Sequence, residues 1–131
     1  MVDFSIPGEP VAFARAGSNG KRRYTPSMQA SYMEIVAIIA NAAMVGTPIF
    51  KGAVRLQIRV ETKAPKSWSL AERAAAKWRT SAPDADNILK LLADAMQKVV
   101  YRNDAQIAHA EIQKIYGLKD CVSVSVTELE P

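Results

Sequence analysis

The sequence is poor in the residues on which several common chemistries depend. Its 131 residues include one cysteine, Cys121, and one histidine, His109. A single cysteine excludes an internal disulfide, and one cysteine with one histidine is too few for a structural zinc site. Both residues lie in segments where apolar and polar residues alternate, so we expect a buried thiol and a structural histidine. No Ser-His-Asp set can be assembled convincingly around His109.

Long apolar runs and glycine-rich phosphate loops are also missing. The longest apolar run, residues 35–45, is interrupted by Asn41 and is too short to cross a bilayer. The N-terminus lacks the series of basic, apolar and small residues that is typical of a signal peptide. No glycine-rich loop precedes a helix in the way that a nucleotide-binding loop does. We therefore expect a cytoplasmic protein that has no membrane partner.

The sequence does contain ample apolar material and an excess of basic residues. Hydrophobic residues make up 49% of the chain and charged residues 23%, which predicts one globular domain over residues 1–131. The net charge of +4 and the pI of about 9.3 favour a polyanionic partner. Four basic residues crowd one segment, ARAGSNGKRRY, and are candidates for contacts with a DNA backbone: Arg15, Lys21, Arg22 and Arg23.

The spacing of apolar residues predicts an α+β domain. Extended segments are expected near residues 2–6, 11–13, 52–62, 105–117 and 121–129, and helices after Thr25, within 69–78 and from Asp84 to Val100. We expect the last two extended segments to form an antiparallel hairpin that closes near residues 117–120. The sheet is then mixed or mainly antiparallel, with about four or five strands, and helices cover one of its faces.

Residues 63–82 interrupt this pattern with a loop and a short polar helix. The two tryptophans of the chain, Trp68 and Trp78, are expected to anchor this insertion by packing. Exposed aromatic rings beside basic residues also stack on unpaired bases, so both explanations stay open for the two rings.

Acidic residues gather around the helix that is expected from Asp84. Asp84 and Asp86 are two residues apart, so in an extended lead-in their carboxylates point to the same side of the backbone. Asp104 lies in the turn after the helix and joins them if the next strand returns beside the lead-in. Lys90 lies four residues after Asp86 on the same helical face. Three carboxylates and a lysine suit Mg²⁺ or Mn²⁺ and the cleavage of a phosphodiester.

A structural explanation of the same residues stays open. Aspartate or asparagine before a helix is a common N-cap, and Lys90 could pair with Asp86 or Asp94 on a solvated face. A calcium-binding EF-hand fits worse, because Ile88 and Leu89 stand where that loop needs an oxygen ligand and a glycine. Glu111 shares a strand face with His109 by the period of two, and we do not assign it to the site.

The acidic segment resembles the signature of the RusA family of Holliday-junction resolvases. That signature reads roughly P-D-x-D-N-x-x-K-x-x-x-D-A, then about eight residues, then D-D-x-Q-[IV]. The matching residues are Pro83, Asp84, Asp86, Asn87, Lys90, Asp94, Ala95, Asp104, Gln106 and Ile107. The segments IPGEPV, YTP and QKIYG are also similar to the family, so the resemblance covers most of the chain. Residues 68–80 are its least informative part.

The resemblance implies that Asp84, Asp86 and Asp104 bind the catalytic divalent ions and that Lys90 is the catalytic lysine. Family members are homodimers that bind four-way DNA junctions and make paired symmetric nicks in recombination and repair, and a prophage setting is typical of them. Two positions depart from the pattern: Asn103 replaces the first aspartate of the D-D pair, and Ala82 stands where relatives often carry Lys or Arg.

Two other functions remain compatible with these residues. The first is a DNA-binding protein of the same fold that does not cleave DNA, in which the acids are caps or structural ligands. The second is a nuclease that prefers flaps or replication forks to four-way junctions.

Overall fold

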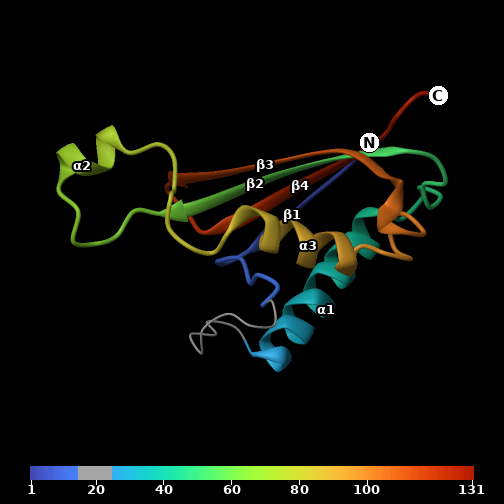
Figure 1. Ribbon diagram of the computed structural model, residues 1–131, viewed down its shortest axis with the longest axis horizontal. Helices are drawn as coiled ribbons and strands as arrows, with labels where there is room; N and C mark the ends of the chain where they lie inside the picture. The colour runs from blue at the N-terminus through green and yellow to red at the C-terminus, as the bar shows by residue number, and fades with distance from the viewer. Residues whose placement is uncertain (15–24) are drawn as a thin grey trace.

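The computed structural model describes residues 1–14 and 25–131. Within these residues it contains strands β1 (Val2–Pro7), β2 (Val54–Lys63), β3 (Ile107–Gly117) and β4 (Cys121–Glu128), helices α1 (Pro26–Ala43), α2 (Leu70–Ala75) and α3 (Ala85–Ala95), and the 3-10 turn η1 (Asp104–Gln106). The strands form one sheet, and α1 and α3 lie on the same side of it (Figure 1). None of the described helices is long and apolar enough to cross a membrane.

The sheet has the strand order β1-β4-β2-β3 and is mixed. Strand β4 runs antiparallel to β1 and β2, whereas β3 runs parallel to β2. The predicted α+β class, strand number and helix-covered face are confirmed, but the predicted hairpin is wrong because β3 and β4 lie on opposite sides of β2. Strand β4 buries Val122, Val124 and Val126 and suits a central position, whereas β3 buries only Ile115 and suits an edge.

The core lies between the sheet and the two long helices. Strand β2 alternates as its sequence predicted, and its buried side chains face the helices: Val54, Leu56, Ile58 and Val60. Helix α3 contributes the fully buried Leu91 and Leu92. Complete burial of one such side chain stabilises the fold by roughly 1.5–3 kcal/mol. The opposite face of the sheet is polar and no described helix covers it.

Two helix boundaries follow local rules. Helix α1 begins as predicted, because the hydroxyl of Thr25 accepts the N–H of Met28 at 3.1 Å and Pro26 occupies the first helical position. Helix α3 ends before the predicted Val100. Lys98 has a φ of 67°, and a residue in this left-handed region cannot continue a right-handed helix.

The turn after α3 is fastened to the core by a buried tyrosine. The hydroxyl of Tyr101 donates to the carbonyl of Ala93 at 2.7 Å, and the ring is fully buried. Burial raises the pKa of Tyr101 well above its ordinary value, and the charges of Asp104 and Asp94 raise it further. The folded protein therefore holds this phenol in its neutral, donating form.

We predict that Tyr101→Phe lowers the free energy of unfolding by about 1 kcal/mol near neutral pH, because a buried hydrogen bond is lost. The ordinary pKa of the group is 10.0 and its folded pKa is raised, so the wild-type protein loses stability as the pH rises above that value. The variant lacks this titration, and its deficit should shrink between pH 9 and 11 in urea unfolding monitored by circular dichroism. A deficit that stays constant over this range would contradict the assignment.

Candidate active site

Asp84 stands at the N-cap position of α3 but its side chain does not cap the helix. The backbone of Asp84 is extended, with φ −69° and ψ 143°, and its carbonyl accepts the N–H of Ile88 at 3.2 Å. The carboxylate makes no capping hydrogen bond, and the residue is exposed. The capping explanation therefore accounts for the position of Asp84 but not for its carboxylate.

Asp86 lies in the first turn of α3 and is exposed as well. The partial positive charge at a helix N-terminus favours an acidic side chain there. The structure thus presents two carboxylates near one end of α3, but only Asp84 has the extended backbone that we expected for both residues, because Asp86 lies within the helix. Figure 1 shows this end of α3 close to the segment that connects it to α2.

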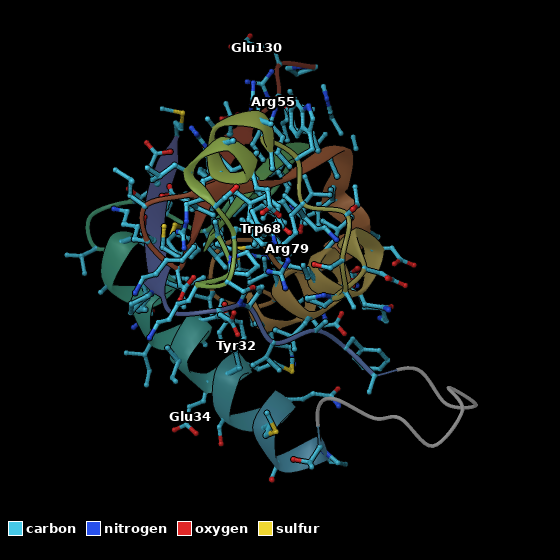
Figure 2. The ribbon with its side chains drawn as sticks, turned by 90° about the vertical axis from the view of Figure 1, so that its left-hand side faces the viewer. Tyr32, Glu34, Arg55, Trp68, Arg79 and Glu130 are labelled. Atoms are coloured by element: carbon cyan, nitrogen blue, oxygen red, sulfur yellow. The ribbon has the colours of Figure 1, made fainter. Side chains whose placement is uncertain are left out.

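Residues 81–83, which we call the lead-in of α3, are held by an arginine that the sequence analysis did not single out. The guanidinium of Arg79 donates to the Ser81 hydroxyl at 3.1 Å, to the Thr62 hydroxyl at 2.7 Å and to the Ala82 carbonyl at 2.7 Å. Thr62 is buried in β2, so these contacts tie the lead-in to the sheet. Arg79 is labelled in Figure 2, which views the molecule from the α2 end.

A lysine of β3 holds the same lead-in from a second side. The ammonium of Lys114 donates to the carbonyls of Ser81 and Pro83, both at 2.8 Å. Burial and the charge of Arg79 lower the pKa of Lys114, while the charge of Asp84 acts in the opposite direction. Arg79 and Lys114 together bind carbonyls of the lead-in and leave the carboxylate of Asp84 exposed. Their roles depend on the pairing of β3 with β2, which no local sequence signal indicates.

Lys90 lies in the middle of α3, and its ammonium pairs with Asp94, which is one turn farther from Asp84 along the helix. Its ammonium lies 3.3 Å from Asp94 Oδ2, with 42% of the Lys90 side chain and 23% of the Asp94 side chain exposed. The ammonium is also 5.3 Å from the centre of the Phe13 ring. One of the two ion pairs considered from the sequence is thus present. Pairs on a partly exposed helix face are weak, about 0.3–0.5 kcal/mol, so the lysine is free to exchange partners.

Asp104 lies beyond the opposite end of α3. Its N–H donates to the side chain of Gln97, two residues after the helix, at 3.1 Å. The 11 residues of α3 span roughly 16 Å, so Asp84 and Asp104 are far apart within one chain. In residues 1–14 and 25–131, no group of three or more His, Cys, Asp and Glu side chains could hold a metal ion. Contrary to our expectation, Asp84, Asp86 and Asp104 therefore do not converge on one point within this chain.

The turn that presents Asp104 is built by its neighbours. The side chain of Asn103 accepts the N–H of Ala105 at 2.8 Å, and that of Gln106 accepts the N–H of Asn103 at 3.0 Å. The amide of Gln106 also donates to the carbonyls of Phe50 and Gly52. Asn103 thus serves as a cap at the position that departs from the family pattern. The described residues offer no hydrogen bond to the carboxylate of Asp104.

Glu111 lies on the face of the sheet that faces away from α3. Its carboxylate accepts the amide of Gln57 at 2.8 Å, whereas Lys114 points toward the start of α3. A hollow on this helix-free face is lined by polar side chains that include Ser5, Gln57, Arg59, Glu111 and Ser125. The sheet separates this hollow from Asp84, so neither Glu111 nor the hollow belongs to the acidic site.

The predicted DNA-contact residues lie outside the described parts of the chain: Arg15, Lys21, Arg22 and Arg23. The residues that precede them are described. Phe13 donates its N–H to the carbonyl of Asn87 at 3.0 Å, so this segment passes beside the first turn of α3 instead of forming the extended strand expected near residues 11–13.

Comparisons with known proteins agree with the acidic motif. Residues 7–127 match the sequence profile of the family described as Endodeoxyribonuclease RusA. The chain is 30% identical to the uncharacterized protein YqaN of Bacillus subtilis (strain 168) over 138 aligned residues, which cover 98% of this chain and 96% of that protein. It is 39% identical over 54 residues to the crossover junction endodeoxyribonuclease rusA of Lactococcus phage r1t. This match covers 40% of this chain and 41% of the phage protein.

We predict that Lys114→Met loosens the start of α3 while the fold persists. The loss of two charge-assisted hydrogen bonds frees the lead-in, and the amide of Ile88, which closes the first turn, should exchange about tenfold faster with solvent. Hydrogen exchange followed by NMR measures this rate. Lys119→Met, at an exposed position between β3 and β4, is the matched control. Unchanged exchange of Ile88 in Lys114→Met would rule out the proposed restraint.

Proposed function

The chain belongs to the RusA family of endodeoxyribonucleases, and from this premise we propose that it resolves four-way DNA junctions by paired symmetric nicks in recombination and repair. The observation that carries the proposal is the pair of exposed aspartates near the start of α3. Asp84 is positioned as a helix cap but does not act as one. Its carboxylate is accessible in a lead-in that two basic side chains restrain.

We further propose that Asp84 and Asp86 hold Mg²⁺, with Mn²⁺ as an alternative. Mg²⁺ is commonly bound by one or two carboxylates and completes its coordination with waters and substrate phosphates, so this donor pair fits it. A bound ion would activate a water and stabilise the departing 3′ oxygen of the phosphodiester. Arg79 and Lys114 keep the carboxylates in place by binding the carbonyls before them.

Lys90 supplies positive charge to the phosphate in this proposal. Its ammonium is partly exposed and pairs with Asp94, an interaction that an incoming phosphate can replace at small cost. The helix fixes the base of the side chain one turn from Asp86. Lys90 therefore stabilises the charge that develops during cleavage more than it contributes to the affinity for DNA.

Asp104 requires a second copy of the chain in order to share an ion with Asp84. The two residues lie beyond opposite ends of α3, and Mg²⁺ binds oxygens at only 2.0–2.1 Å. In a two-fold symmetric homodimer, each copy offers the same surface to the other, so the partner's Asp104 has a route to the start of α3. The homodimer also matches the near two-fold symmetry of an open junction.

Contacts with the DNA backbone are assigned to the basic residues Arg15, Lys21, Arg22 and Arg23. Phe13, which lies two residues before Arg15, contacts the carbonyl of Asn87 beside the acidic site. Phosphate contacts position a duplex without reading its sequence, so recognition rests mainly on the shape of the branched DNA.

Cleavage of a synthetic four-way junction in Mg²⁺, and its loss in EDTA, tests this proposal. Binding without cleavage would favour the alternative of a junction-binding protein that has no catalytic activity. A panel of junctions, flaps and forks separates junction resolution from a flap or fork nuclease. Faster cleavage of a flap than of the four-way junction would overturn the assigned substrate.

We predict that Lys90→Ala lowers the rate of junction nicking by about 100-fold, because the lost charge acts at the reacting phosphate. The affinity for the junction should fall less than threefold, since one lysine is a small part of the phosphate contacts. Single-turnover nicking and gel shifts on the same preparation measure the two effects, with Lys119→Ala as the control. Equal losses of rate and affinity would reduce Lys90 to an ordinary DNA contact.

We predict that Asp104→Asn abolishes Mg²⁺-dependent nicking and leaves folding and junction binding intact. Asparagine preserves the turn, because the capping contacts there come from Asn103 and Gln106. The change removes a charged oxygen donor, and loss of a negative charge near phosphate should leave binding equal or stronger. Nicking at the wild-type rate would show that Asp104 is only a turn residue.

A further inference from the structure

The segment between β2 and the lead-in of α3 forms an arm that projects past the sheet. We define the arm as residues 63–79; it contains α2, none of whose residues is buried. Figure 1 shows α2 beyond the end of the strands, separated from α1 and on the side where α3 begins. Because the arm buries little apolar surface, packing of the hydrophobic core does not account for the length or the position of the arm.

The charge of the arm is strongly positive. Five basic residues stand against one acid, Glu72, and give a net charge of +4: Lys63, Lys66, Arg73, Lys77 and Arg79. The complete chain, with 17 basic and 13 acidic residues, also has a net charge of +4. The rest of the protein is therefore balanced as a whole, and the arm matches a polyanion.

The two tryptophans of the arm have different environments. Trp68 packs edge-on against Tyr116, with ring centres 4.8 Å apart and planes at 60°, so it is a packing anchor as predicted. Trp78 is 55% exposed, and the same prediction is wrong for it. Trp68 is labelled in Figure 2, which views the molecule from the α2 end.

Trp78 is exposed on a backbone that is held in place. Its neighbours pair with β3: the N–H of Arg79 donates to the carbonyl of Lys114, and the N–H of Tyr116 donates to the carbonyl of Lys77, both at 2.9 Å. The ammonium of Lys77 lies 4.8 Å from the centre of the Trp78 ring. A fixed backbone, an accessible indole and adjacent cations are what a base-stacking platform for single-stranded DNA requires.

The location of Trp78 connects this platform to the acidic site. The next residue, Arg79, binds Ser81 and Ala82, which lie three and two residues before Asp84. A single exposed aromatic residue is ordinary on a protein surface. Here, however, the ring is coupled through one residue to the restrained lead-in of the acids, and it lies in the most basic part of the described chain.

We propose that the arm binds an unpaired DNA strand and that Trp78 stacks on one of its bases, next to the phosphodiester held at Asp84. This inference rests on the proposed function, because it assumes that DNA reaches the acidic site. Unpaired or easily opened bases occur at the centre of a branched DNA, and stacking tolerates any sequence since every base has a π face. The arm thus favours DNA in which a base is unpaired next to the phosphodiester that is cleaved.

The fluorescence of a single tryptophan tests this proposal. Trp68→Phe leaves Trp78 as the only tryptophan of the chain, and Trp78→Phe leaves Trp68. Each protein is titrated with oligothymidylate and with a four-way junction in EDTA, and complex formation is followed by gel shift. Emission from Trp78 should be quenched as the complexes form, and emission from Trp68 should not change. Unchanged Trp78 emission in a saturated complex would overturn the proposal.

Affinity supplies an independent readout. Trp78→Ala should weaken binding of oligothymidylate roughly tenfold, and Trp78→Phe should restore most of the loss because a ring is regained. Leu118→Ala is the control, since Leu118 is 95% exposed, apolar and outside the arm. An equal loss in Trp78→Ala and Leu118→Ala would exclude stacking. Junction nicking in Mg²⁺ without a Trp78 response refutes this inference alone, whereas a protein that neither binds nor nicks DNA refutes the proposed function as well.

Discussion

The length and direction of α3 determine where each candidate catalytic group lies. The helix carries Asp84 and Asp86 at its start and Lys90 in its middle, and the chain reaches Asp104 only after passing its far end. A helix rises about 1.5 Å per residue and bends little, so a span of roughly 16 Å cannot close onto one ion. The same rigidity that positions two carboxylates therefore keeps the third away from them.

The mixed sheet adds a second restraint on the same end of the helix. Because β3 runs parallel to β2, the C-terminal half of β3 lies beside the start of α3. Lys114 in this half donates to the carbonyls of Ser81 and Pro83. Arg79 joins these carbonyl contacts from the arm. The two basic side chains thus donate hydrogen bonds to backbone carbonyls, and the carboxylate of Asp84 remains accessible. The site is positioned by tertiary contacts more than by the helix cap.

Features that depend on neighbouring residues were predictable from the sequence. The cap at Thr25, the alternation of β2 and the helix after Asp84 all follow from short-range spacing. Features that depend on distant pairing were not. The central place of β4 depends on which apolar face the sheet buries, and the roles of Arg79 and Lys114 appear only after β3 pairs with β2. The acidic motif identified the two aspartates near the start of α3, but spacing alone could not show that Asp104 lies at the far end.

Mixing two inactive variants tests most directly whether each site combines residues from two copies. Asp84→Asn and Asp104→Asn proteins are combined under conditions in which subunits exchange, and junction nicking is measured in Mg²⁺. If Asp104 acts across the homodimer, a mixed dimer has one site with both changes and one site that is intact, so single nicks should return. If each chain forms its own site, both sites of the mixed dimer are damaged. The account predicts that nicking returns on mixing; two variants that exchange subunits and remain inactive would contradict it.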